Sequence, residues 1–222
     1  MEITSRLGLG AALGLAVGTF AASASAAYTP KLIVQAQGQQ TTINVSQDAT
    51  DDSTARIVIY APRDVSATLN QPPRTQIGSV RGLINILDLA PPAGVNQEFT
   101  GGITTVAPSE APPTVALCAP GAHDAIWVVS PTAAGASLEA IPMVVDRITT
   151  GPEAAFASAK ITVCFRPPDI PQGTPGRSPS GARLLQASFT LLGVFTSPTG
   201  GSSLAWNALF TPYTPRVGQV NG

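Results

Sequence analysis

Basic and acidic residues are both scarce in this 222-residue chain. Asp, Glu, Lys and Arg together make up 11% of it, the formal net charge is −1, and lysine occurs only at Lys31 and Lys160. Proteins that bind nucleic acids present clustered Lys and Arg side chains, and electrostatic attachment to a membrane surface needs similar basic patches. We therefore expect no nucleic-acid partner and no attachment to a membrane through a basic surface.

Histidine is nearly absent, because His123 is the only one. A serine or cysteine hydrolase needs a histidine as its base, and a zinc site needs three or four His, Cys, Asp or Glu ligands. Asp124 is a poor partner to orient His123, since adjacent residues of an extended chain point to opposite sides. The chain also contains no Gly-x-Ser-x-Gly motif. We expect a protein that is not an enzyme and has no catalytic residue.

Long apolar runs are confined to the first residues, which have the three parts of a secretory signal peptide. "MEITSR" is followed by the apolar stretch "LGLGAALGLAVGTFAA" and then by Ala24-Ser25-Ala26, a small-x-small cleavage site. The apolar stretch is short and glycine-rich for a transmembrane helix, which needs about 20 residues. We predict a signal peptide over residues 1–26 and a single exported domain over residues 27–222. The mature chain, without a transmembrane segment, would then be extracellular or in the cell envelope.

Cysteine occurs only at Cys118 and Cys164. In an exported protein such a pair indicates a disulfide, whereas a catalytic thiol at Cys118 or a metal thiolate is the alternative. The bridge would close a loop of about 46 residues, to which loop-entropy models assign about 4 kcal/mol of stabilisation. We predict a Cys118–Cys164 disulfide.

Short runs with alternating or β-branched residues, cut by Gly and Pro, predict strands. "KLIVQAQ" and "TTINVSQ" flank Gly38-Gln39-Gln40 as a hairpin, "ARIVIYAP" places Ile57 and Ile59 on one face, and "TQIGSVRGLINILDL" predicts one or two strands broken near Gly82. "GPEAAFASAK" predicts a helical turn. Further strands are expected in "TVALC", "DAIWVVS", "LEAIPMVVD", "SAKITVCF", "RLLQASFTLLGVF" and "SLAWNALFTPY", with "TSPTGGS" as a hairpin-like turn between the last two.

Ten or more short strands favour an all-β fold, an antiparallel immunoglobulin-like β-sandwich with long Pro/Gly-rich loops. The stretch "VALCAPGAHDAIWVVS" fits it as strand, turn and strand. On this interpretation Cys118 ends the first strand, His123 lies at the loop tip, and Trp127 supplies buried area from the second strand.

The longest proline-rich segment, "RPPDIPQGTPGRSPSGAR", predicts an extended, polyproline-like loop over residues 166–183. Long loops in compact domains often carry function, although a passive crossover stiffened by proline is the alternative. If the loop is functional, we expect its contact residues to include Pro167, Pro168, Asp169 and Arg177.

Two sets of acidic residues suggest other sites. "SQDATDDST" gathers Asp48, Asp51 and Asp52, which predict a calcium site at a loop end or, alternatively, an Asx-turn cluster in solvent. Pairs of carboxylates for glycoside hydrolysis are also available, but any chain with a dozen acids offers them. The candidates are Asp88, Glu98, Asp146 and Asp169.

The order Cys118, Trp127, Cys164 resembles that of immunoglobulin domains in architecture, although "KITVC" lacks the tyrosine found there two residues before the cysteine. The segments "CAPGAHDAIWVV", "CFRPPDIP", "GARLLQASFTL" and "WNALFTPYTP" are similar to those of exported bacterial β-sandwich proteins with no assigned function. This resemblance covers nearly all of the chain after residue 26 and implies no catalytic residues.

Together these patterns predict an exported, non-catalytic binding or structural protein at the cell surface or outside the cell. Its partner would be an envelope or extracellular protein or glycan that adds a strand to a sheet edge or grips the proline loop. A secreted hydrolase using carboxylates such as Asp146 and Asp169 is one alternative. A protease inhibitor that presents the loop around Arg177 is another.

Overall fold

The computed structural model describes residues 28–198 and 204–221, so the predicted signal peptide lies outside the described residues. The helical segments are short, and none of them within the described ranges is long and apolar enough to cross a membrane. They are η1 (Leu87–Leu89), η2 (Pro108–Glu110), α1 (Thr114–Cys118), η3 (Pro152–Ala155) and η4 (Pro179–Gly181). The strands are β1 (Lys31–Gln37), β2 (Gln40–Ser46), β3 (Thr54–Pro62), β4 (Ser66–Ala67), β5 (Gln76–Ile86), β6 (Val95–Val106), β7 (Ala125–Ala133), β8 (Ala136–Ser137), β9 (Ile141–Arg147), β10 (Ala157–Cys164), β11 (Ala182–Leu192), β12 (Phe195–Thr196) and β13 (Asn207–Pro212).

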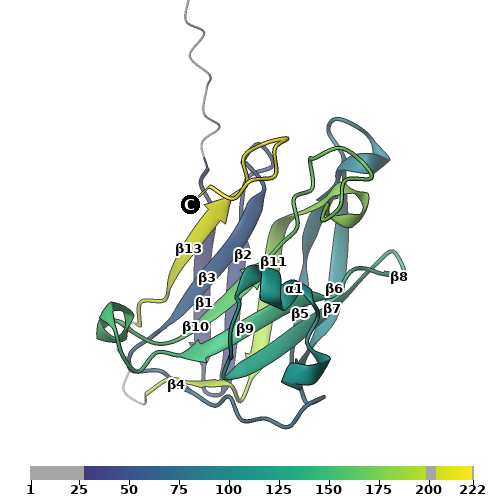
Figure 1. The fold of residues 1–222 in the computed structure, drawn as a ribbon. Coiled ribbons are helices and arrows are strands. Elements are labelled where there is room, and N and C mark those ends of the chain that lie inside the picture. Colours follow the sequence, from purple (N-terminus) through teal and green to yellow (C-terminus); the bar gives the residue numbers. More distant parts are fainter. Residues whose placement is uncertain (1–27, 199–203, 222) are drawn as a thin grey trace, which may run out of the picture.

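The predicted all-β, antiparallel architecture is confirmed. One sheet has the order β1-β2-β11-β5-β6-β7-β9-β10-β3-β13, with β8 paired to β7, and β4 pairs separately with β12. The sheet curls on itself into a nearly closed sandwich (Figure 1). This continuous order does not confirm the immunoglobulin-like topology, because that fold divides its strands between two sheets.

The segment before β1 reaches across to the start of β3, near the other end of the sheet. The hydroxyl oxygens of Tyr28 and Thr54 are 2.7 Å apart, and the Thr29 N–H donates to Asp51 Oδ2 over 3.2 Å. These bonds hold the segment before β1 against the start of β3 and the loop before it.

The core contains the predicted residues, but burial along β3 does not strictly alternate, because Val58 between the two isoleucines is buried as well. Ile57 and Ile59 of β3 are both buried, as expected, and Trp127 of β7 has no exposed surface. Phe195 packs edge-to-face against Trp127, with ring centroids 6.4 Å apart, and against Trp206, with centroids 5.3 Å apart. Such aromatic contacts add to the area that the core buries.

Several predicted elements are wrong. "TVALC" forms the short helix α1 and not a strand, because Pro113 at its N-cap has helical backbone angles and Val115 packs on Ile126. β5 runs unbroken through Gly82, where the missing side chain makes room for the Phe99 ring. The β11 and β13 strands do not form a hairpin, since β13 pairs with β3, and part of "TSPTGGS" lies outside the described residues.

The helical turn predicted in "GPEAAFASAK" is confirmed as η3.

Candidate ligand-binding pocket

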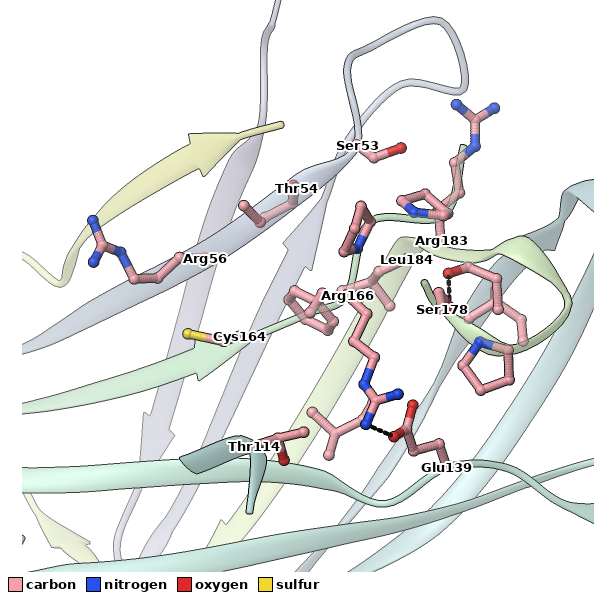
Figure 2. Close-up of a pocket in the computed structure, with 18 of the residues that line it drawn as sticks. Ser53, Thr54, Arg56, Thr114, Glu139, Cys164, Arg166, Ser178, Arg183 and Leu184 are labelled. Carbon is pink, nitrogen blue, oxygen red and sulfur yellow. Dashed lines mark hydrogen bonds and ion pairs between the residues drawn. The ribbon is translucent and has the colours of Figure 1, made fainter. Parts of the chain in front are cut away.

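A cavity of about 620 Å³ opens at one end of the sandwich, where β3 begins, β10 ends and β11 begins (Figure 2). Small-molecule sites are concave, mostly apolar spaces of roughly 300–1,000 Å³, so this cavity has the size of such a site. Its walls come from segments far apart in the chain, which only the curled sheet brings together.

Most of the pocket wall is apolar. Some of the apolar lining residues lie in strands and others in the segments between them. The strand residues include Ala55, Ile84, Phe99 and Leu184, and the others include Phe165 and Pro168. An apolar molecule that enters this space would remove surface from water on both sides, which is favourable.

Four charged residues among the described ones line the pocket, namely the arginines Arg56, Arg166 and Arg183 and one acid, Glu139. Arg166 Nη2 lies 2.8 Å from Glu139 Oε1, and 39% and 36% of the two side chains are exposed. Figure 2 shows the Arg166 side chain running past the wall residues to reach Glu139. The pair therefore connects the segment after β10 with the segment before β9.

The other two arginines have no carboxylate partner among the described residues. Arg183 donates to Asn85 Oδ1 over 3.3 Å and to the Ala49 carbonyl over 2.7 Å. Burial lowers the pKa of Arg183, and nearby Asp169 partly opposes this effect. The Nε atom of Arg56 is buried without a hydrogen-bond partner in the described part of the chain.

The hydroxyl of Thr114, in α1, is also buried without a partner among the described residues, and Thr114 lines the pocket. Buried polar groups are nearly always hydrogen-bonded, because an unpaired one loses its water without compensation. Because this hydroxyl has almost no accessible surface, it lies behind the wall that a ligand would touch.

The proline-rich segment forms part of the outer wall, where Pro167 and Pro168 line the pocket as two of the four predicted contact residues. The third predicted contact residue, Arg177, does not line the pocket. Its Nη1 and Nη2 donate to both carboxylate oxygens of Asp88, at 2.9 and 2.7 Å, and only 11% of its side chain is exposed. The hydrogen bond from Arg177 lowers the pKa of Asp88 below its ordinary value. A protease inhibitor needs an exposed reactive residue, so Arg177 does not fit that role.

The fourth predicted contact residue, Asp169, helps to hold the segment in place. Its Oδ2 accepts the backbone N–H of Arg216 over 2.8 Å, and its Oδ1 is buried without a partner in the described residues. Asp169 is thus tied to the chain after β13 and does not line the pocket.

The predicted Cys118–Cys164 disulfide is confirmed, with Cα atoms 5.7 Å apart. It fastens α1 to the end of β10, and both cysteines line the pocket. The sulfur atoms are therefore a fixed part of the wall, and neither cysteine is a free thiol.

His123 is not at an exposed loop tip, because only 6% of its side chain is exposed. Its Nδ1 lies 3.0 Å from Asp146 Oδ1, and its Nε2 lies 2.7 Å from the Ala119 carbonyl. Sequence reasoning considered Asp124 as the orienting acid and missed Asp146, which comes from β9. Both ring nitrogens of His123 face acceptors, so the histidine holds this loop in place. Within the described residues no hydroxyl or thiol bonds to the ring.

The predicted acidic sites do not assemble. Within residues 28–198 and 204–221, no group of three or more His, Cys, Asp or Glu side chains is arranged to hold a metal ion. Asp51 is buried, and its Oδ2 accepts the N–H groups of Thr29 and Asp48, which makes it a turn-forming residue. Asp146 contacts His123, whereas Asp169 contacts Arg216, so different parts of the fold hold these two acids.

Sequence reasoning missed the polar residues of the pocket. Arg166 and Arg183 were noticed only as the ends of the proline-rich segment, and Arg56, Glu139 and Thr114 only as residues of predicted strands, not as site residues. The one available signal was the rarity of charge, since any arginine that begins or ends a strand in so neutral a chain is a candidate. That signal does not show which arginines meet.

Comparisons with protein-family models, with curated proteins and with solved structures found no match. The function of this chain has therefore to be inferred from the geometry and chemistry of the pocket.

Proposed function

We propose that this is an exported, non-catalytic binding protein that acts at the cell surface or outside the cell, with its ligand in the pocket at the end of the sandwich. The cavity of about 620 Å³, walled by apolar side chains and closed on one side by the proline-rich segment, carries the proposal. The ligand is a small molecule with a large apolar part, because a ligand's surface should match the wall that it covers. The arginines among the lining residues support a polar group on the same molecule.

The residues that line the pocket support binding and not hydrolysis. Glycoside hydrolysis needs two carboxyl groups, and a Ser- or Cys-based hydrolase needs a nucleophile beside a base. Among the described residues that line the pocket, Glu139 is the only acid, there is no histidine, and both cysteines are in the disulfide. Glu139 is itself paired with Arg166.

The disulfide supports export, because such bonds form and persist in oxidising compartments. The secretory pattern of residues 1–26 points the same way. A binding protein with a stiff, proline-rich wall also needs little reorganisation when its ligand enters, which preserves binding free energy.

A titration with an uncharged, environment-sensitive dye such as N-phenyl-1-naphthylamine tests the proposal. We expect saturable fluorescence enhancement with one site per chain. Ala182→Phe fills the cavity at a lining position and should abolish it, whereas Ala36→Phe, at an exposed position of β1, should not. Linear, unsaturable enhancement, or equal binding by both variants, would reject the pocket as the binding site.

A further inference from the structure

We propose that the ligand is a long-chain carboxylate whose acidic group binds Arg166 while its apolar chain fills the cavity. This inference rests on the proposed function, because it names the chemical class of the molecule that the pocket takes. The apolar wall alone would also accept neutral or cationic amphiphiles. The charged residues around the pocket distinguish these two classes from the anionic one.

The charge of the pocket differs from that of the whole chain. The chain has a formal net charge of −1, yet the pocket is lined by three arginines and one glutamate. Only Glu139 neutralises any of them by direct contact within the described residues. A low-dielectric wall strengthens the field of the remaining positive charge, so an anionic ligand is favoured over a neutral or cationic one.

Arg166 is the arginine that is free to exchange its partner. The ion pair with Glu139 is exposed on both sides, and pairs of this kind contribute little to stability in water. A ligand carboxylate offers the same acceptor geometry and can accept two parallel N–H bonds from the guanidinium. The displaced Glu139 carboxylate can be hydrated, because its side chain is already partly exposed.

The other two arginines are poorer candidates for the acidic group. Arg183 already donates from Nε to Asn85 and from Nη2 to the Ala49 carbonyl, and its side chain is directed away from Arg166 and Glu139 (Figure 2). The Arg56 side chain is directed away from Arg166 and Glu139 (Figure 2). Both still contribute positive potential to the pocket, but the geometry assigns the direct contact to Arg166.

Arg166 and the apolar residues that would contact the chain line the same cavity. Phe165 is adjacent to Arg166 in sequence, and Ile84, Phe99 and Leu184 come from three neighbouring strands, β5, β6 and β11. A ligand with its acid at the mouth and its chain inside keeps its charge partly in water. This orientation avoids the cost of burying an unpaired carboxylate.

The test compares dodecanoate with dodecan-1-ol, which have the same chain length, by competition with the uncharged dye at pH 8 and below the micelle concentration. Four proteins are compared: the unmodified chain, R166Q, E139Q and R74Q. Arg74 and Glu110 form an exposed ion pair at 2.7 Å that does not line this pocket, so R74Q is the matched control.

We expect the unmodified protein and R74Q to bind dodecanoate at least 10-fold more tightly than the alcohol. R166Q should lose this preference with unchanged affinity for the alcohol. E139Q should bind dodecanoate several-fold more tightly, because the competing carboxylate is gone. Equal affinities for acid and alcohol in the unmodified protein, or a preference that survives in R166Q, would overturn the inference while leaving the pocket as a binding site. Failure of the dye and of both ligands to bind would instead reject the proposed function itself.

Discussion

Arg177 and Asp88, 89 residues apart in the chain, meet through two hydrogen bonds of 2.9 and 2.7 Å. The pair fastens the proline-rich segment to η1, directly after β5, and a third bond from Arg177 Nε to the Ile170 carbonyl, at 2.6 Å, closes the segment on itself. This anchorage keeps the outer wall of the pocket in position. It also buries the residue that an exposed inhibitory loop would have to present.

The first prediction concerns the pH dependence of this anchorage. Because Arg177 lowers the folded-state pKa of Asp88 below its ordinary value of 3.8, the ionised pair stabilises the folded protein above that value. This contribution is lost as the pH falls through the depressed folded-state pKa. The difference in melting temperature between the unmodified protein and Asp88→Asn should therefore be largest near neutral pH and shrink below pH 3.8. A difference that is constant down to acid pH would show that the charge of Asp88 plays no part.

The second prediction concerns protection of the same segment from proteolysis. Since only 11% of the Arg177 side chain is exposed, trypsin should cleave after Arg177 slowly in the folded protein and much faster in Asp88→Ala. The products can be identified by mass spectrometry after timed digestion. Fast cleavage of the unmodified protein at Arg177 would show that the anchorage does not hold in solution.

How far sequence patterns predict this fold depends on the kind of strand. β1, β2 and β3 have alternating or β-branched residues and were predicted with nearly correct ends. β6, "VNQEFTGGITTV", was missed although it lies near the middle of the sheet, because its polar residues and two glycines resemble a loop. Gly101 is needed there, since a side chain would collide with the Ser130 carbonyl of β7.

The candidate site was predictable only where it depends on local composition. The proline-rich segment and the cysteine pair could be recognised from the chain itself, and both contribute to the pocket. The pairing of Arg166 with Glu139 depends on the order of strands in the sheet, which local patterns do not encode. The same reason explains why Asp146 was not foreseen as the partner of His123.

The third prediction uses two glycines of neighbouring strands. A methyl group at Gly82 would collide with the Gln186 carbonyl and approach the Phe99 ring to 2.7 Å, whereas one at Gly102 would meet only Gln76 Nε2, at 3.8 Å. Gly82→Ala should lower the free energy of unfolding by about 1–3 kcal/mol, the usual cost of overpacking. Gly102→Ala should have little effect in the same urea titration. Similar losses for the two variants would contradict the tight contact at Gly82.

The fourth prediction concerns the disulfide. The bridge closes a loop with a sequence separation of 46, so its removal in a Cys118→Ser, Cys164→Ser variant should cost about 4 kcal/mol of unfolding free energy. Reduction of the unmodified protein should give the same loss, which controls for the serine side chains. Because the bridge also fixes α1 against the pocket, dye affinity should fall. Unchanged stability and unchanged dye binding would show that the disulfide neither stabilises the fold nor supports the pocket.

The fifth prediction separates the buried histidine from an exposed ion pair beside it. His123→Ala removes the hydrogen bonds of the ring to the Asp146 carboxylate and the Ala119 carbonyl and should cost about 1–3 kcal/mol in urea unfolding. Arg147→Gln removes only the exposed pair with Asp124 and should cost less than about 1 kcal/mol. Both variants should retain dye binding, because neither residue lines the pocket at the end of the sandwich. Loss of dye binding in His123→Ala with intact stability would give this histidine a role that the geometry does not show.

The central claim is that a ligand enters the cavity at the end of the sandwich, and two-dimensional amide NMR during dye titration tests it most directly. The account predicts saturable shifts concentrated in residues 53–56, 138–142, 164–168 and 182–184, which come together only at the pocket. Strands β1 and β2, which contribute no lining residue, should be unaffected. Shifts confined to those two strands, or no saturable shifts at all, would contradict the account.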